Sequence, residues 1–190
     1  MRLFVAIDIP AVIRENIREL IGTLKPAATN IRWSRPEGLH LTIKFLGEAQ
    51  PAQLEAIKSS LATVHLAAPF SIAIRGSGCF PNERSPRVLW LGVDAGPELP
   101  EIAARAESSL EPLGFAKETR PFNAHLTLGR INGPGKILAM QEILRRREPL
   151  DFGTFEAREF FLFESKPGAN GSVYTKIARF EIASGNAPRG

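Results

Sequence analysis

Cysteine is nearly absent from this chain of 190 residues, with Cys79 as its single representative. One cysteine cannot form an internal disulfide, which excludes the small secreted scaffolds that disulfides hold together. Long apolar runs are missing too: the longest, near residues 88–93 and 160–163, fall far short of the ~20 residues of a membrane-spanning helix. The first apolar stretch meets Asp8 and offers no small-residue cleavage site, so we expect a cytoplasmic protein without membrane contact.

The chain also lacks a large excess of charge of either sign. Lys and Arg total 24 against 20 Asp and Glu, a net charge of +4 that permits a polyanionic partner without requiring one. Histidine is scarce, with three in the whole chain. Apolar residues make up 44% of the sequence, enough for the core of one ordinary domain or of two small lobes.

Helical and strand-like patterns follow one another irregularly along the chain. Apolar residues at helical spacing predict four amphipathic helices within residues 13–24, 54–64, 99–113 and 137–144. Runs typical of strands occupy residues 3–9, 39–46, 70–75, 88–93, 124–131, 155–163 and 173–182. The order is no strict βαβ alternation, so the sequence predicts an α+β fold.

Three segments without such patterns mark the organisation of the chain. Residues 165–172 are rich in turn formers and indicate a turn between two long antiparallel strands. Residues 76–86 are the best candidate for a crossover between two halves, since no low-complexity linker separates them. We expect a single bilobal domain over residues 1–183, followed by a loose tail at 184–190.

A short motif occurs twice in the chain. The segment His40-Leu41-Thr42-Ile43-Lys44-Phe45 returns as His125-Leu126-Thr127-Leu128-Gly129-Arg130, and an Arg-Pro pair precedes each copy. Both copies fall in strand-like runs. Two copies are too few for a solenoid, so they predict a pair of related lobes that face each other.

Strand geometry says which side chains of the motif lie together. Successive side chains alternate between faces, so His40 and Thr42 share one face, as do His125 and Thr127. Two imidazoles and two hydroxyls can therefore converge on one cleft between the lobes.

The same alternation bears on two basic residues of the motif. It places Lys44 on the face of His40, where it could lean over a phosphate, although an exposed strand lysine is equally ordinary. Arg130 offers a planar fork for a phosphate. Alternation turns it away from His125 unless Gly129 allows a bulge.

Three interpretations of the histidine pair compete. Each histidine could simply be bonded to its neighbouring threonine, although the repetition at matching places argues against this. A zinc site needs three or four ligands, and no Asp or Glu stands at i+2 or i+4 from either histidine. In paired acid–base catalysis, one imidazole accepts a proton from the nucleophile and the other donates one to the leaving group. Two hydroxyls that bind phosphate oxygens complete a set suited to a phosphodiester.

Over nearly its whole length the chain resembles the two-histidine phosphoesterases, and among them the RNA 2',3'-cyclic phosphodiesterases that are also described as 2'-5' RNA ligases. Besides both copies of the motif, the resemblance rests on residues 2–7, 31–33, 46–48, 78–81, 87–90, 120–122, 162–165 and 173–174. One departure is Ala124, where the family often has proline.

The resemblance implies a fold and an activity. The fold is bilobal α+β, with two pseudo-symmetric lobes of antiparallel sheet flanked by helices and the active-site cleft between them. The activity is hydrolysis of a terminal 2',3'-cyclic phosphate, on RNA or a nucleotide, to a 2'-phosphomonoester, without metal or nucleotide cofactor. By microscopic reversibility, an RNA hydroxyl in place of water would give 2'-5' ligation.

The resemblance also implies roles for the residues of the motif. His40 and His125 are the catalytic pair, and family usage suggests His125 as base and His40 as acid, an order that the sequence itself leaves open. Thr42 and Thr127 bind the phosphate, and Arg130 and Lys44 are further candidate contacts. We expect a monomer that binds RNA ends. The alternatives are a noncatalytic RNA-end binding module and a phosphodiesterase for another small cyclic or 2'-5' linked nucleotide.

Overall fold

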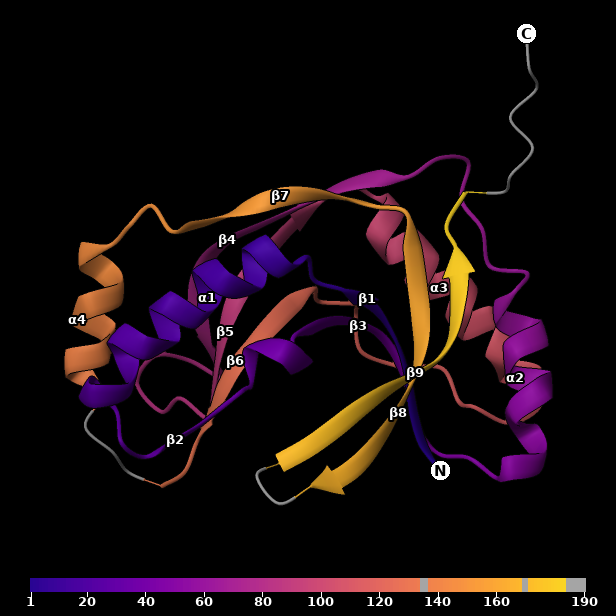
Figure 1. Ribbon diagram of the computed structural model, residues 1–190, viewed down its shortest axis with the longest axis horizontal. Helices are drawn as coiled ribbons and strands as arrows, with labels where there is room; N and C mark the ends of the chain where they lie inside the picture. Colours follow the sequence, from indigo (N-terminus) through magenta and orange to yellow (C-terminus); the bar gives the residue numbers. More distant parts are fainter. Residues whose placement is uncertain (134–136, 169–170, 184–190) are drawn as a thin grey trace, which may run out of the picture.

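The computed structural model describes residues 1–133, 137–168 and 171–183, which form an α+β fold of two antiparallel sheets and four α-helices (Figure 1). The strands are β1 (Arg2–Asp8), β2 (Ile31–Trp33), β3 (His40–Glu48), β4 (Phe70–Phe80), β5 (Val88–Ala95), β6 (His125–Ile131), β7 (Asp151–Ala157), β8 (Glu159–Gly168) and β9 (Gly171–Glu181). The helices are α1 (Ala11–Leu24), α2 (Leu54–Leu61), α3 (Glu98–Leu110) and α4 (Leu138–Arg146), with short 3-10 turns η1 (Lys25–Ala27), η2 (Pro36–Gly38), η3 (Pro51–Gln53) and η4 (Glu111–Leu113). The tail expected at 184–190 lies outside the described residues.

The two halves of the chain exchange strands between the sheets. One sheet has the order β3-β1-β8-β9 and the other β2-β6-β5-β4-β7. Strands β2 and β4 from the first half thus join the sheet of β5 and β6, while β8 and β9 from the second half join the sheet of β1 and β3. This exchange ties the two lobes together by backbone hydrogen bonds in each sheet.

Each helix forms because its apolar residues recur at helical spacing and face the core. On α1 the buried positions are Ile13, Ile17, Leu20, Ile21 and Leu24, as the periodicity predicts. The side chain of Asn16 on the same helix donates to the carbonyl of Phe152 on β7. In Figure 1, α1 and α4 lie beside the five-stranded sheet, and α2 and α3 lie on the side of the four-stranded sheet.

One large cluster of buried side chains joins the helices to both sheets. It includes Leu41 from β3 and Leu126 and Leu128 from β6, each fully buried. The leucines of both motif copies therefore face the core, as the alternation predicts. A second, separate cluster lies on the opposite face of the four-stranded sheet and consists of Phe4, Ala6, Phe161 and Phe163.

The predicted strand over residues 155–163 is wrong, because two strands occupy this stretch. The chain leaves β7, which pairs with β4, and enters β8, which pairs with β1, with Arg158 between them. The carbonyl of Arg158 accepts a hydrogen bond from the amide of Ile182. No glycine or proline marks the break, and apolar residues continue on both sides, so the sequence shows one run where the chain changes sheets.

The expected crossover at residues 76–86 is also shorter than predicted. β4 continues past Gly76, which adopts a positive φ of 68°, and pairs with β5 as far as Phe80. The positive φ of this glycine bends the strand, which then continues after an irregular step in register. The pattern in the sequence predicts that the strand ends at the same glycine. The short edge strand β2 has no counterpart among the predicted strands.

The expected turn at residues 165–172 is shorter as well. Pairing of β8 with β9 continues as far as Gly168 opposite Gly171. Within the described ranges, no helix has the length and apolar character needed to cross a membrane.

Candidate active site

Both motif histidines open a strand and are held in the same way. His40 is the first residue of β3, and His125 is the first residue of β6. The Nδ1 atom of His40 lies 2.7 Å from the carbonyl oxygen of Gly38, and that of His125 lies 2.8 Å from the carbonyl oxygen of Asn123. Since a carbonyl can only accept, each Nδ1 carries the proton, and each Nε2 is left for chemistry.

The threonines follow on the same face in both copies. In the ladders of the two sheets, Thr42 lies opposite Ala6, and Thr127 lies opposite Trp90. Both threonines are half-buried. Within the described residues neither hydroxyl has a hydrogen-bond partner, so both remain available to a ligand.

A bulge then interrupts each motif strand at the same place. On β6, Thr127 lies opposite Trp90 and Arg130 lies opposite Val88. Two residues of β6, Leu128 and Gly129, therefore occupy the place opposite the single residue Leu89 of β5. Residues directly opposite in a ladder point to the same side. Arg130 therefore lies on the same face as Thr127. The sequence allows this placement only if there is a bulge at Gly129, and the structure contains that bulge.

The matching bulge on β3 has the reverse effect on Lys44. Lys44 lies opposite Val5 and points into the core, where it is 4% exposed. Its Nζ forms an ion pair with Glu107 and donates to the carbonyl of Ala116 at 2.8 Å. Lys44 therefore does not lie on the face of His40, and the predicted substrate contact is wrong. The prediction assumes strict alternation along an unbroken strand, whereas the bulge turns the side chain of Lys44 to the opposite face.

The same bulge brings Phe45 to the face of the histidine. It lies opposite Phe4 and is 71% exposed, with its ring centroid 6.0 Å from that of Phe4. Phe45 and Arg130 thus occupy equivalent positions in the two copies. One lobe presents an aromatic ring where the other presents a guanidinium.

Two reciprocal tethers bring the motif strands together. Ser34, which precedes β3, donates from its backbone amide to the carbonyl of Leu128 and from its hydroxyl to the carbonyl of Thr127. In the other direction, Lys44 on β3 binds the carbonyl of Ala116 in the segment that leads to His125. These hydrogen bonds join the two lobes close in sequence to each histidine. Strands β3 and β6 accordingly contact each other in the fold.

Aromatic rings surround His40. Its centroid lies 4.5 Å from that of Phe4 and 4.9 Å from that of Tyr174, which meets it edge-on. This burial lowers the pKa of His40 from its ordinary value, while the carbonyl of Gly38 and the charge of Asp8 act to raise it. The free protein consequently favours the neutral imidazole at this position.

The environment of His125 is more open. Phe80 meets its ring edge-on at 5.1 Å between centroids, and Trp90 lies 5.3 Å from Phe80. Gly78, beneath Trp90, leaves room for the indole, because a Cβ there would come within 2.3 Å of the ring. A small residue in β4 thus makes room for the indole of Trp90, which packs against Phe80 beside His125.

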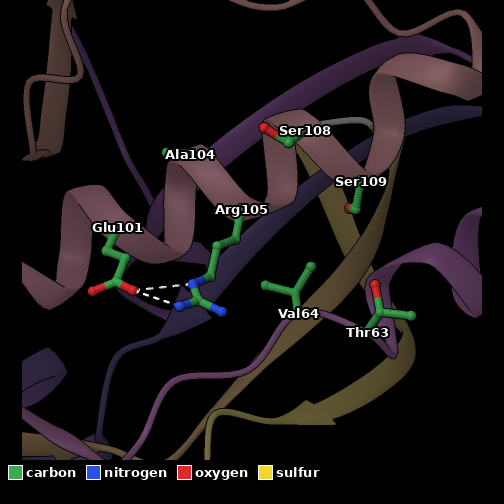
Figure 2. Close-up of a pocket in the computed structure, with 7 residues that line it drawn as sticks. All are labelled: Thr63, Val64, Glu101, Ala104, Arg105, Ser108 and Ser109. Atoms are coloured by element: carbon green, nitrogen blue, oxygen red, sulfur yellow. Dashed lines mark hydrogen bonds and ion pairs between the residues drawn. The ribbon is translucent and has the colours of Figure 1, made fainter.

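A pocket on the surface lies away from these residues. It is formed by α3 and the residues that follow α2, and Arg105 within it is ion-paired with Glu101 (Figure 2). None of its lining residues comes from β3 or β6: they are Thr63, Val64, Glu101, Ala104, Arg105, Ser108 and Ser109. The chemistry of the paired motif therefore does not belong to this pocket.

One known family matches both halves of the chain. The family described as LigT like Phosphoesterase matches residues 7–90 and matches again at residues 91–174. The chain belongs to the LigT-like phosphoesterase family. Each match contains one His-x-Thr motif, so the two halves of this LigT-like phosphoesterase are copies of one unit.

Relatives and solved structures extend the similarity over most of the chain. The RNA 2',3'-cyclic phosphodiesterase of Archaeoglobus fulgidus is 37% identical over 95% of this chain and 100% of its own length. That of Thermus thermophilus is 32% identical over 96% of this chain and 90% of its own length. The crystal structure of a Thermus thermophilus protein has a TM-score of 0.80 at 29% identity, covering 98% of this chain and 100% of that one. Escherichia coli LigT complexed with 3'-AMP has a TM-score of 0.75 at 27% identity, covering 96% and 98%.

The sequence of this LigT-like phosphoesterase does not predict that Asp8 and Phe4 lie beside His40. Asp8 lies opposite His40 in the ladder, and its carboxylate accepts from Lys176 at 2.6 Å and from Arg14 at 3.1 Å. Alternation along β1 puts Phe4 and Asp8 on one face. Only the pairing of β1 with β3, which no local pattern reveals, brings that face to His40.

Proposed function

We propose that this chain hydrolyses terminal 2',3'-cyclic phosphates of RNA to 2'-phosphomonoesters by acid–base catalysis with His40 and His125. The observation that carries the proposal is the matched pair of Nδ1–carbonyl contacts, at 2.7 and 2.8 Å, that leaves both Nε2 atoms for proton transfer. Relatives named RNA 2',3'-cyclic phosphodiesterase, similar over nearly the whole chain, support the substrate.

The carbonyl contacts select the tautomer that acid–base catalysis needs. With the proton fixed on Nδ1, a neutral imidazole presents a lone pair at Nε2 and acts as a base. A cationic imidazole presents an N–H at the same point and acts as an acid. One side-chain type, held identically in two lobes, can therefore supply both functions.

In the proposed reaction, the Nε2 atom of His125 takes a proton from water as its oxygen attacks phosphorus. The bond from phosphorus to the 3'-oxygen breaks, and the Nε2–H of His40 protonates that oxygen. The product has a 2'-phosphate and a free 3'-hydroxyl, and proton exchange with solvent resets both rings. An RNA 5'-hydroxyl in place of water would give a 2'-5' linkage with the same leaving oxygen.

The surroundings of the histidines suit this assignment. Burial lowers the pKa of His40, but an anionic phosphodiester beside the ring favours the cation, as Asp8 already does. His40 would then gain its proton when substrate binds. The hydroxyls of Thr42 and Thr127 and the guanidinium of Arg130 would hold the phosphate oxygens between the two rings.

Replacing Thr42 or Thr127 with valine should lower kcat/KM without unfolding the strand. Valine preserves the β-branched shape but removes the hydroxyl. One hydrogen bond to a phosphate oxygen corresponds to a loss of about 3 to 100-fold. Kinetics with the cyclic-phosphate RNA would measure the loss, with Thr154→Val on the exposed face of β7 as the control. Wild-type kinetics in both variants would show that the threonines do not bind the phosphate.

The ring of His40 should titrate below the ordinary histidine value in the free protein. Burial opposes its cation, so protonation requires a pH below about 6.5. The limb of the kcat/KM profile that belongs to His40 should lie there too, because this parameter reports the free enzyme. Asp8→Asn removes a charge that raises the pKa, so it should move both the titration and the limb to lower pH. NMR titration of the imidazole would check this, and a midpoint at or above 6.5 would contradict it.

The direct test is ring opening of a short RNA that ends in a 2',3'-cyclic phosphate. We expect turnover in the presence of EDTA, because the proton transfers are assigned to side chains and the phosphate contacts to hydroxyls and a guanidinium. Binding of the RNA end without turnover would favour the binding-module alternative. Loss of activity in EDTA that zinc or magnesium restores would contradict the acid–base account.

A further inference from the structure

Two arginines face each other across β2 and β6 on the sheet face that carries His125. Arg32 is the direct partner of Arg130 in the ladder, and both side chains are exposed. Their neighbours Ile31 and Ile131 also pair and are buried in the core. Because strand residues alternate, Arg32 and Arg130 point away from the core and share the face of Thr127.

No Asp or Glu side chain of the protein compensates the charge of this pair. Every Asp and Glu of the chain lies within the described residues. None of these carboxylates comes within ion-pair distance of Arg32 or Arg130. Like charges placed directly opposite in a sheet repel each other, so the arrangement is unfavourable without an anion.

Elsewhere in the same sheet the chain does compensate such a charge. Arg75 on β4 lies opposite Asp151 on β7, and its Nε is 3.2 Å from that carboxylate. Arg75 also lies 3.7 Å from Asp94 on the other neighbouring strand. The sheet thus compensates Arg75 but leaves the facing arginines of β2 and β6 without a carboxylate partner.

From this juxtaposition we infer that Arg32 binds the internucleotide phosphate that precedes the reacting one, so that the site takes an RNA chain in preference to a cyclic mononucleotide. The inference rests on the proposed function. Arg130 is on the motif strand and would contact the reacting phosphate. Arg32 is one strand further out, about 4.8 Å away across the ladder, on the edge strand of the sheet.

Only an oligonucleotide offers a second anion at that place. A cyclic mononucleotide has one phosphate, which the histidines, threonines and Arg130 already engage in the proposed complex. A guanidinium binds a phosphate through two parallel hydrogen bonds. The edge of the sheet at β2 therefore sets the direction in which the RNA chain leaves the site.

The test compares Arg32→Gln with wild type on two substrates. One is adenosine 2',3'-cyclic phosphate, and the other is a short RNA that ends in the same cyclic nucleotide. For the RNA, kcat/KM should fall about 10-fold, and its dependence on salt should weaken by about one phosphate contact. For the mononucleotide, kcat/KM should stay within about twofold of wild type. Arg32→Lys should recover part of the RNA activity, and Arg75→Gln serves as the matched control.

Two results would overturn the inference. An equal fall on both substrates would place Arg32 at the reacting phosphate or in the fold, and no fall on either would exclude a chain contact. If the wild type opened neither ring, the proposed function would fail separately. Fluorescence anisotropy with the labelled RNA would then still show whether Arg32→Gln weakens binding.

Discussion

Replacing His40 or His125 with alanine is expected to lower turnover of the cyclic-phosphate RNA by roughly 10² to 10⁴. This corresponds to about 3 to 5 kcal/mol of activation free energy. Each variant would remove one of the two proposed proton transfers and leave the proposed phosphate contacts in place. Because the two rings act in one step, the double variant should be little worse than the poorer single one. Steady-state kinetics on all three variants would measure these losses.

The third histidine provides the control for this experiment. His65 lies beyond α2, where its Nδ1 is 3.3 Å from the carbonyl oxygen of Glu181. His65→Ala should therefore leave turnover unchanged. Since the ring of His40 packs among aromatic side chains, circular dichroism must show that His40→Ala is folded. A folded variant of either motif histidine with near-normal turnover would make that histidine structural.

Lys44→Met is expected to destabilise the protein by about 3 to 5 kcal/mol, because it leaves a partly buried carboxylate without its cation. The side chain of Lys44 is 3% exposed and that of Glu107 is 17% exposed. Methionine keeps the apolar stem of lysine, so the loss reports the unpaired charge and not a cavity. Urea denaturation, with the midpoint and slope both fitted, would measure the free energy of unfolding.

A second variant separates the charge from the packing. Lys44→Met combined with Glu107→Leu removes both charges, and its stability should return most of the way to wild type. Lys58→Met, which breaks the exposed pair with Glu55, should cost no more than about 1 kcal/mol. If Lys44→Met kept full stability and only raised KM for RNA, Lys44 would be a substrate contact after all.

The sequence predicts the parts of the site that depend on local pattern. Alternation within a strand is enough to put His40 with Thr42 and His125 with Thr127, because both pairs precede the bulges. The α+β fold follows from mixed periodicities, and the four helices form where apolar residues recur at helical spacing. The repeated motif itself predicts two lobes, and the double match of the family bears this out.

The remaining features depend on pairing between distant strands. Nothing local tells Lys44 from a surface lysine. Its partner Glu107 is distant in sequence, and the bulge that turns it inward is visible only in the register with β1. The exchange of β8 and β9 into the first sheet is hidden for the same reason, because an unbroken apolar run passes through Arg158 at the change of sheet.

The identity of the product tests the central claim most directly. In-line attack needs the base and the acid on opposite sides of phosphorus, and the proposed pair of histidines from two lobes would provide this for one orientation of the ring. The flanks of the motif differ, with Phe45 in one lobe where Arg130 stands in the other, so the RNA should bind in one direction. Phosphorus NMR of the product should therefore show a single 2'-phosphomonoester, whereas a pure 3'-phosphate or an equal mixture of both would contradict the assigned roles of His40 and His125.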